Sequence, residues 1–413
     1  MSSGFFPEGQ FAKPKQFSTA SRCGACGLYK TCHHPKMAPQ GLGGRNILFV
    51  LPPVTEQEDL SGKFLQTQLG FEIKSILKRN NVSPLEDCSY TSAIICHTAQ
   101  PSNEQIDFCS FKLKETIGNL NPNLIIPIGA EAIRSIIQFT WNKPAGLTDR
   151  WCGYQIPAQT INAWICPTYQ PSFEDRDNSM LFTTQHIEDS LKLADMKPWG
   201  KLPDFQSKVK LLYTEREIEK ALIPWITKPF VAGFDYETTC LKPDNPKTAR
   251  IVSGSFSFNA KATYAFPWLP NVPGLLKALC KNKEGGFIGS NMKYEERWSK
   301  TLLGFFMKRW KWDTMLAAHA IDNRGGKNDG EDSGGGGGLS GLKFQAFARL
   351  GQPSYDDHIK QYLGSDGTHT RNRIKEIPLK ELLLYNGMDA LLSWVVAKHQ
   401  MRQMGHPMLE LMK

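Results

Sequence analysis

A short apolar segment that ends in two acids constrains this chain most. Residues 230–239 read Phe-Val-Ala-Gly-Phe-Asp-Tyr-Glu-Thr-Thr. Valine, alanine and phenylalanine in this run favour a buried β-strand, in which residues two apart point to the same side. Asp235 and Glu237 should therefore project together and could bind a cation. An ordinary strand with a polar end at a turn is the alternative interpretation, so other motifs must decide between the two.

The composition is that of a globular protein with room for two or three domains. Of the 413 residues, 40% are hydrophobic and 22% are charged. No apolar run approaches the ~20 residues of a membrane span, and the first residues lack the basic and apolar regions of a secretory signal. These features predict an intracellular protein. The net charge of +9 would help a phosphate-rich partner to approach, but it does not distinguish nucleic acid binding from general solubility.

The first half of the chain alternates apolar strands with helical stretches. Residues 1–20 predict a loose arm, and the pattern that follows, to about residue 196, predicts an α/β sheet with crossover helices. The predicted strands are residues 47–51, 90–96, 124–128 and 164–168, and the predicted helices are residues 71–77, 106–120, 130–139 and 183–196.

A connector rich in proline and glycine, residues 197–205, separates this half from a second α/β pattern over residues 206–413. Residues 325–341 contain a run of glycines and predict a flexible insert, either natural or introduced as a linker. In the second half, strands are expected at residues 209–213, 230–239, 251–258, 262–266 and 286–289, and helices at residues 214–222, around 275, at 342–350 and at 378–404.

Ten cysteines in a large chain without a secretory signal favour metal or cluster ligation for any closely spaced set. Cys23 and Cys26 form a Cys-x-x-Cys motif, which fits zinc, a redox pair or an iron–sulfur cluster. Cys32 follows closely, and Cys96 and Cys109 lie further along the chain. If the arm folds back onto the sheet, four or five thiols could converge, and four thiolates suit a tetrahedral zinc ion or a 4Fe-4S cluster equally well.

Residues 20–196 resemble the family 4 uracil-DNA glycosylases and their relatives. The resemblance rests on five motifs in the same order: Cys23-x-x-Cys26-x-Leu28, Glu58-Asp59-x-x-Gly62, the pair Cys96 and Cys109, residues 124–129 (Leu-Ile-Ile-Pro-Ile-Gly) and residues 167–172 (Pro-Thr-Tyr-Gln-Pro-Ser). It implies an α/β/α sandwich that holds a 4Fe-4S cluster on Cys23, Cys26, Cys96 and Cys109, with Cys32 as a neighbour or alternative ligand. Structural zinc is the alternative. The cluster would fix loops at a DNA-facing surface rather than transfer electrons.

The departures from that family affect the residues of base excision. Pro52 replaces the acid that follows the first strand, Leu65 replaces the aromatic that stacks on the flipped base, Ser92 replaces the base-reading asparagine, and Gln170 replaces the histidine of a His-Pro-Ser motif. Base excision needs a stacked, hydrogen-bonded base and stabilisation of developing charge. We therefore expect this domain to be inactive as a glycosylase and to serve as a scaffold or DNA-binding module.

Two further segments carry acids in positions that suit a metal site. Residues 288–296, Ile-Gly-Ser-Asn-Met-Lys-Tyr-Glu-Glu, predict a strand that turns into a helix bearing Glu295. In a strongly helical region, Tyr385 and Asp389 are four residues apart and so share one helix face. Taken alone, such a pair is usually a packed aromatic beside a solvated acid.

Taken together in this order, these segments and residues 235–237 resemble the tyrosine-bearing branch of the DEDD superfamily of 3′-to-5′ exonucleases. The resemblance covers residues 205–413 and includes residues 312–316 (Trp-Asp-Thr-Met-Leu) and the helix at 342–348. It implies a ribonuclease H-like mixed sheet and two Mg²⁺ or Mn²⁺ ions, which in such sites lie roughly 3.5–4 Å apart and stabilise the attacking and leaving oxygens of a phosphodiester. It assigns the ions to Asp235, Glu237, Glu295 and Asp389, and the attacking water to Tyr385.

The fourth acid of that family is usually aspartate, whereas Glu295 aligns there and reaches one methylene further. Glu296 is the weaker substitute, because it lies one helical step off that face. We expect Asn291 and Lys293 to orient the strand end and the scissile phosphate, with a solvated cation at the start of a helix as the alternative for Lys293. Residues 305–312 interleave basic and aromatic side chains and could hold single strands by stacking, or could be a buried strand with one charged side. Residues 371–373, Arg-Asn-Arg, could meet DNA from a polar loop or be a plain surface loop.

A glycosylase-like cluster domain followed by a DEDD exonuclease resembles the N-terminal part of certain phage family A DNA polymerases. Because the chain ends soon after the Asp389 helix, we expect either a separate exonuclease subunit of a split replicase or a truncated polymerase. The predicted function is a metal-dependent 3′-to-5′ DNA exonuclease that proofreads for a polymerase partner in the cytoplasm of a phage-infected bacterium. The alternative is a non-catalytic DNA-binding or polymerase accessory protein with both sites degenerate.

Overall fold

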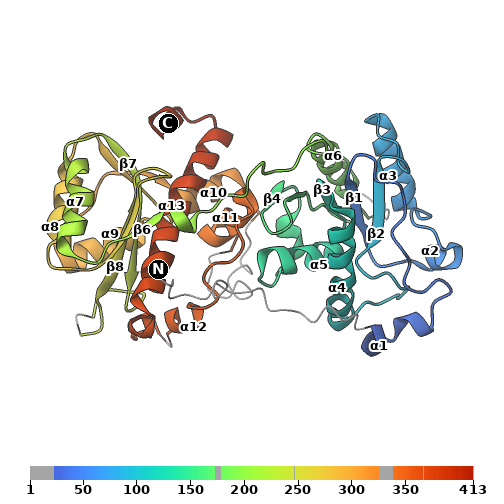
Figure 1. Cartoon of the computed structure of the whole chain (residues 1–413), viewed down its shortest axis with the longest axis horizontal. Coiled ribbons are helices and arrows are strands. Elements are labelled where there is room, and N and C mark those ends of the chain that lie inside the picture. Colours follow the sequence, from blue (N-terminus) through green and yellow to red (C-terminus); the bar gives the residue numbers. More distant parts are fainter. Residues whose placement is uncertain (1–22, 173–177, 246, 325–337, 366, 413) are drawn as a thin grey trace, which may run out of the picture. The chain divides into compact units, whose positions relative to one another are not determined.

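The computed structural model describes residues 23–172, 178–245, 247–324, 338–365 and 367–412. The chain divides into two compact units (Figure 1): unit 1 is Met1–Leu202 with Phe347–Ser354, and unit 2 is Pro203–Ala346 with Tyr355–Lys413. The division after Leu202 falls within the predicted connector. The predicted arm, residues 1–20, and residues 325–337 of the predicted insert lie outside the described residues.

Unit 1 is built on a five-stranded sheet in the order β2-β1-β3-β5-β4. The first four strands in this order are parallel, and the last is antiparallel to its neighbour. The strands are β1 (Ile47–Leu51), β2 (Cys88–Ser92), β3 (Leu124–Pro127), β4 (Ile156–Ala158) and β5 (Ala163–Ile165). The helices are α1 (Cys23–Cys26), α2 (Glu56–Ser61), α3 (Gln68–Arg79), α4 (Asn103–Leu120), α5 (Ala130–Trp141) and α6 (Ser179–Leu191).

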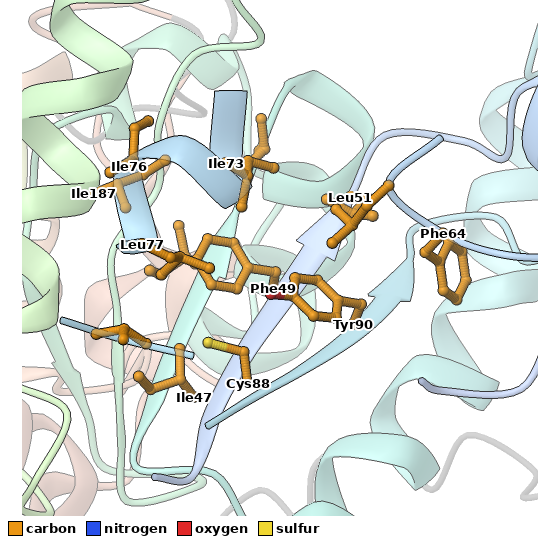
Figure 2. Packing of buried hydrophobic residues seen from close by; sticks show 14 of the residues in the cluster. Ile47, Phe49, Leu51, Phe64, Ile73, Ile76, Leu77, Cys88, Tyr90 and Ile187 are labelled. Atoms are coloured by element: carbon orange, nitrogen blue, oxygen red, sulfur yellow. The ribbon is translucent and has the colours of Figure 1, made fainter. Parts of the chain in front are cut away.

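The core of unit 1 explains why its central strand is apolar throughout. All five residues of β1 are buried, although alternate side chains of a strand point to opposite faces. Phe49 stacks on Tyr90, with their ring centroids 5.5 Å apart, and this face packs against Ile73 of α3 and Ile187 of α6 (Figure 2). Because both faces of the strand are covered, the unit is the α/β/α sandwich predicted from the sequence.

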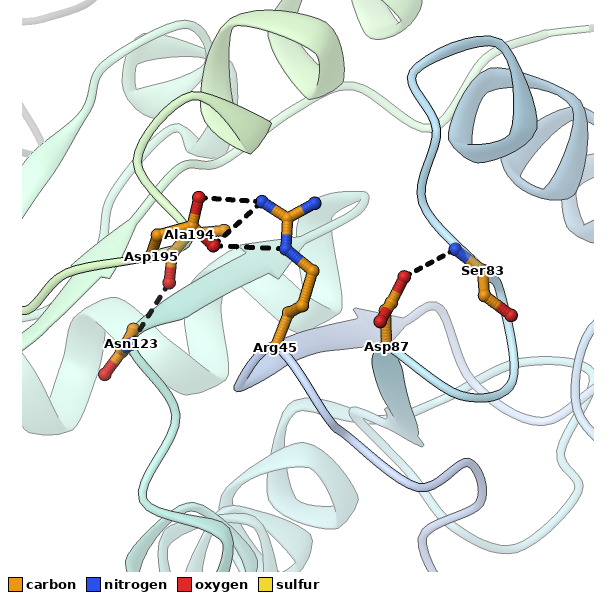
Figure 3. A network of polar contacts seen from close by, with 6 residues as sticks. All are labelled: Arg45, Ser83, Asp87, Asn123, Ala194 and Asp195. Atoms are coloured by element: carbon orange, nitrogen blue, oxygen red, sulfur yellow. Dashed lines mark hydrogen bonds and ion pairs between the residues drawn. The ribbon is translucent and has the colours of Figure 1, made fainter.

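Polar contacts attach residues 194 and 195, which follow α6, to the sheet of unit 1 (Figure 3). Arg45, just before β1, forms a two-pronged ion pair with Asp195, with Nη2–O distances of 2.8 and 2.9 Å. Asn123, just before β3, donates its side-chain amide to the carbonyl of Ala194 at 3.1 Å. Asp195 is largely exposed, so the ion pair adds little stability. The contacts fix where the chain leaves the sandwich.

Unit 2 contains a six-stranded mixed sheet in the order β11-β10-β7-β8-β9-β6. β7, β8 and β9 are antiparallel neighbours, and the remaining pairs are parallel. The strands are β6 (Val209–Leu211), β7 (Phe230–Thr238), β8 (Ile251–Ser257), β9 (Thr263–Pro267), β10 (Gly285–Gly289) and β11 (Trp310–Asp313). The helices are α7 (Glu215–Ile226), α8 (Val272–Lys281), α9 (Lys293–Trp298), α10 (Thr314–Ile321), α12 (Lys360–Leu363) and α13 (Leu379–Gln403).

The two faces of this sheet carry different chemistry. Phe234 and Tyr236 of β7 face a core of aromatic residues and of apolar residues from α7 and α8. The opposite face is crossed by the long helix α13, which packs against β7 and β8. Gly233 makes this approach possible, because a Cβ there would lie 2.1 Å from the carbonyl oxygen of Ala390 in α13. The alternation of β7 therefore puts Asp235 and Glu237 on the face that carries α13.

The structure confirms the predicted fold class, two α/β domains of which the second has a mixed sheet. It also differs from the sequence-based elements in detail. The strand predicted at residues 90–96 ends at Ser92, and β4 was not predicted. Helix α11 (Leu342–Leu350) ends in the segment that belongs to unit 1, where Phe347 stacks on Trp141 with ring centroids 5.7 Å apart. Among the described helices, none is both long and apolar enough to span a membrane.

Candidate active site

Three of the predicted acids meet where β7 passes beneath α13. One oxygen each from Asp235, Glu237 and Asp389 lies within 4.8 Å of the others. Asp235 and Glu237 are half-buried on β7, and Asp389 on α13 is 4% exposed. A site made only of carboxylate oxygens suits a hard divalent cation such as Mg²⁺ or Mn²⁺. The residues present therefore fit the metal that the motifs imply.

The fourth acid, Glu295 on α9, lies beside this trio rather than within it. It is 2% exposed, and its Oε2 has no hydrogen-bond partner among the described residues. Burial, followed by the charge of Asp235, raises the pKa of Glu295 well above its usual range. A buried carboxylate oxygen without a partner is costly, and a bound cation or a water on it would remove that cost.

Burial and crowding raise the pKa values of the two acids of β7 as well. Burial and the charge of Asp389 raise the pKa of Asp235 well above its usual range. Burial, Asp235 and Asp389 do the same to the pKa of Glu237. Like charges close together disfavour the ionised form. Without a cation, the folded protein therefore favours the protonated forms of Asp235 and Glu237.

Three donors from the protein reach into the cluster, and the sequence reasoning missed all of them. Asn386 donates its side-chain amide to Asp235 Oδ2 at 2.6 Å. Tyr355 donates its hydroxyl to Asp389 Oδ1, and Lys343 of α11 donates its ammonium to Asp389 Oδ2 at 2.5 Å. Only Asn386 gave a signal in the sequence, because it follows Tyr385 in the same motif. Nothing local to residues 343 or 355 indicates that their side chains face an acid on another helix.

Tyr385 lies one turn before Asp389 on α13 and is 8% exposed. Lys343 donates a hydrogen bond to its hydroxyl oxygen at 3.0 Å. Burial and the charge of Asp389 raise the pKa of Tyr385 well above its usual range, so it stays a neutral phenol. Since its oxygen already accepts a hydrogen bond, the phenolic hydrogen remains available to a water or phosphate oxygen.

The neighbouring acids are engaged in the fold. The Asp313 carboxylate caps α10 and also accepts the backbone N–H groups of Asn291 and Met292 at 3.1 and 2.9 Å. The Glu296 carboxylate accepts the indole N–H of Trp310 at 2.7 Å and the backbone N–H groups of residues 307 and 308. Glu296 is therefore bound to the turn before β11, which agrees with Glu295 as the candidate ligand.

The residues that were predicted to contact the substrate lie in different surroundings. Asn291 follows β10 with φ of 70°, a left-handed conformation that asparagine tolerates better than most residues, and Lys293 is exposed at the start of α9. In residues 305–312, Trp310 packs into the aromatic core and donates to Glu296, while Trp312 donates to Gln400. The aromatic side chains of this segment thus belong largely to a strand and its core, as the alternative interpretation held.

The loop with Arg371 and Arg373 is attached to the end of β7. Asn372 donates its backbone N–H to the carbonyl of Thr239 at 2.8 Å and its side-chain amide to that of Thr238 at 3.0 Å. Lys242 donates its backbone N–H to the carbonyl of Thr368 at 2.9 Å. Both arginines are exposed. The loop therefore places two cations directly after the strand that carries Asp235 and Glu237.

In unit 1, the four predicted cluster ligands share one pocket. Cys23 and Cys26 of α1, Cys96 and Cys109 all line it, together with apolar residues and Lys112. Burial raises the pKa of Cys96 to about 11 and that of Cys109 to about 12. The predicted alternative, Cys32, does not line the pocket, and its thiol lies 3.1 Å from the carbonyl oxygen of Leu28.

A separate cavity of about 200 Å³ follows β1 in unit 1, and three of the four departures from the glycosylase pattern meet there. Pro52, Leu65 and Gln170 all line it. Ser92, the fourth, is buried, with its hydroxyl oxygen 2.6 Å from the carbonyl oxygen of Pro52. The Glu58 carboxylate at the cavity accepts hydrogen bonds from the Leu65 backbone and from Thr55. These polar groups are thus occupied by the fold itself.

Comparison with known proteins supports part of this picture. Residues 46–192 match the family model of the uracil DNA glycosylase superfamily. This region of unit 1 is thus similar to the uracil DNA glycosylase superfamily. No curated protein matches the chain. A solved structure described as the apo form of the nuclease is 10% identical, with a TM-score of 0.29, over 48% of this chain and 84% of that one. Trypanosoma brucei RNase D is 13% identical, with a TM-score of 0.28, over 46% of this chain and 64% of that one.

Proposed function

We propose that this protein is a metal-dependent 3′-to-5′ DNA exonuclease that proofreads for a family A DNA polymerase of phage type. The observation that carries the proposal is the convergence of Asp235, Glu237 and Asp389 within 4.8 Å, from segments about 150 residues apart in the sequence. Tyr385 on the same helix and Glu295 beside Asp235 complete the set of five residues that the motifs predict. The polymerase partner and the phage setting are proposed from the domain combination alone.

The arrangement suits hydrolysis of a phosphodiester at a DNA end. Asp235, Glu237 and Asp389 would hold Mg²⁺ or Mn²⁺, with Glu295 as a further ligand directly or through water. When bound, the metal would stabilise charge on the phosphate and activate water. Tyr385 would donate its free phenolic hydrogen to the attacking water and so orient it. The exposed Lys293, Arg371 and Arg373 would attract the phosphate backbone.

A primer with a 3′ mismatch, incubated with the protein and Mg²⁺ or Mn²⁺, tests this proposal. We expect shortening from the 3′ end that requires the metal and is lost in Asp235→Ala. No shortening in either metal, or equal shortening by Asp235→Ala, would contradict it. Tight DNA binding without turnover would instead favour the non-catalytic accessory protein, which the position of Glu295 outside the trio also favours.

For unit 1 we propose a 4Fe-4S cluster on Cys23, Cys26, Cys96 and Cys109, in a domain that binds DNA or polymerase without excising bases. One observation supports this ligand set: the four thiols line one pocket. The same four thiolates could hold a structural zinc ion instead.

The colour of protein purified without air tests the cluster. We expect a brown protein that loses its colour and iron in Cys96→Ser, while Cys32→Ser keeps both and serves as the matched control. Colourless protein with one zinc per chain would overturn the cluster in favour of structural zinc. Release of uracil from DNA would overturn the inactive-glycosylase part of the proposal.

A further inference from the structure

Lys343 carries a full positive charge into the acid cluster. Its side chain is 18% exposed, and its ammonium contacts Asp389 Oδ2 at 2.5 Å and Tyr385 Oη at 3.0 Å. The ammonium also lies 4.7 and 5.3 Å from the ring centroids of Tyr385 and Tyr355, a distance at which a cation is attracted to an aromatic face. The lysine is thus held on several sides rather than extended into water.

This placement needs an explanation, because a lysine side chain loses hydration and rotamer freedom when it is buried. Three acids with oxygens within 4.8 Å repel one another when they ionise, and Glu295 is a fourth acid close to Asp235. An ammonium at Asp389 reduces that repulsion. The same ammonium joins α11 to two residues of α13, the proposed metal ligand Asp389 and the proposed water-positioning Tyr385.

We propose that Lys343 is a positioning residue that acts as the built-in counter-ion of the metal centre. Without a divalent ion, its ammonium holds Asp389 and Tyr385 in place. A divalent ion that binds to the acids does so against the charge of this ammonium. The inference rests on the proposed function, since it takes the acid trio to be a metal site. It adds that Lys343, which is not one of the five predicted site residues, keeps the site assembled and limits its affinity for the metal.

Binding of Mn²⁺ without DNA provides the test, measured by calorimetry and by thermal unfolding. Lys343→Met keeps most of the side-chain volume and removes the charge, so we expect it to bind Mn²⁺ about tenfold more tightly than the wild type, since removing a like charge at close range strengthens cation binding. In EDTA we expect this variant to unfold at a lower temperature than the wild type and to gain more from saturating Mn²⁺. Lys343→Arg keeps the charge and should bind Mn²⁺ within about threefold of the wild type.

Lys277→Met is the matched control, because Lys277 is exposed on α8 and the core face separates that helix from α13. It should change neither Mn²⁺ affinity nor unfolding in EDTA. Lys343→Gln, which keeps a hydrogen-bond donor without the charge, answers the same question should the methionine variant not fold.

The outcomes separate this inference from the function on which it rests. If the wild type binds Mn²⁺, Asp235→Ala does not, and a folded, uncharged variant at position 343 binds equally or more weakly than the wild type, the counter-ion role is overturned while the metal centre stands. If the wild type binds no Mn²⁺, or Asp235→Ala binds it equally well, the metal centre is overturned and this inference with it.

Discussion

The acid cluster of unit 2 and the cavity of unit 1 both gather polar side chains after a buried strand, but the two regions use them differently. At the cavity, Glu58 accepts hydrogen bonds from Thr55 and Leu65, and Ser92 bonds to backbone carbonyls. In the cluster, Asp235 and Glu295 have raised pKa values, and one oxygen of Glu295 has no hydrogen-bond partner in the described part of the chain. Polar groups that the fold satisfies indicate a scaffold. Acids that the fold brings close together, where they repel one another, indicate a binding site for a cation.

Removing a central acid should break this contrast most strongly. Asp235→Ala is expected to lower exonuclease turnover at least about 10³-fold, because it removes a metal ligand and the charge stabilisation that the metal supplies. In EDTA its stability should equal or exceed that of the wild type, since the repulsion falls. Single-turnover kinetics and thermal unfolding measure the two effects. Asp244→Ala, which removes a surface ion pair with Arg297, is the control and should change neither.

The acid beside the trio should matter less. Glu295→Gln is expected to lower turnover about 10- to 100-fold, the range for a residue that orients or supplements metal ligands. Glu296→Gln is its neighbour and control. Because Glu296 accepts bonds from the turn before β11, that change should reduce stability while Mn²⁺ affinity stays unchanged. Full activity of Glu295→Gln would mean that Glu295 has a structural role, like the hydrogen-bonded polar groups at the cavity of unit 1.

A conservative change at the cavity sharpens the other side of the comparison. Glu58→Gln should destabilise unit 1 by about 1–3 kcal/mol, because it replaces a buried carboxylate that accepts several hydrogen bonds. The exonuclease rate should not change, and neither the wild type nor Glu58→Gln should release uracil from DNA. Denaturant unfolding and the primer assay test this, and a lower exonuclease rate at unchanged stability would contradict the assignment of Glu58 to the scaffold.

The smallest expected effect is a dependence of the thermal stability of unit 2 on pH, and its sign should differ with and without the metal. Asp235, Glu237 and Glu295 have raised pKa values in the folded state, so folding favours their protonated forms. Their contribution to stability is present below the unfolded pKa values near 4 and is lost as pH rises through the folded values. In EDTA, unit 2 should therefore unfold at a lower temperature at pH 8 than at pH 5.5. The shift should be a few degrees, since each pKa unit is worth about 1.4 kcal/mol.

Saturating Mn²⁺ should reverse this trend, because the ion binds the ionised carboxylates and competes with protons. Thermal unfolding at both pH values, with Mn²⁺ and with EDTA, measures the sign. The same slope in both conditions would mean that other groups dominate.

The sequence predicted the parts of the fold and site that depend on short-range spacing. The apolar run of β7 with acids two residues apart, and the Tyr385–Asp389 pair one helical turn apart, fixed which side chains share a face. In unit 1, β1 and β3 were visible as short apolar runs, whereas β2, which reads Cys-Ser-Tyr-Thr-Ser, was predicted two residues late. β4 was missed because it has three residues, one of them a proline, and is defined mainly by its pairing with β5.

What the sequence could not predict depends on contacts between distant segments. Lys343 and Tyr355 lie 46 and 34 residues before Asp389, in stretches whose local pattern is only that of a helix and a loop. Their roles arise because the side chains of Lys343 and Tyr355 meet Asp389 of α13 within the fold of unit 2. The return of Phe347–Ser354 to unit 1 has the same origin, since it depends on the stacking of Phe347 on Trp141.

The absence of a side chain at position 233 sets how far the acids of α13 stand from those of β7. Ala390 follows Asp389 directly, and its carbonyl occupies the space that a methyl group at position 233 would need. A single added carbon would act as a spacer that lifts the helix and moves Asp389 away from Asp235. Random mutagenesis should therefore find inactive variants at this glycine that retain every acid, and a search for lost activity limited to charged residues would overlook them.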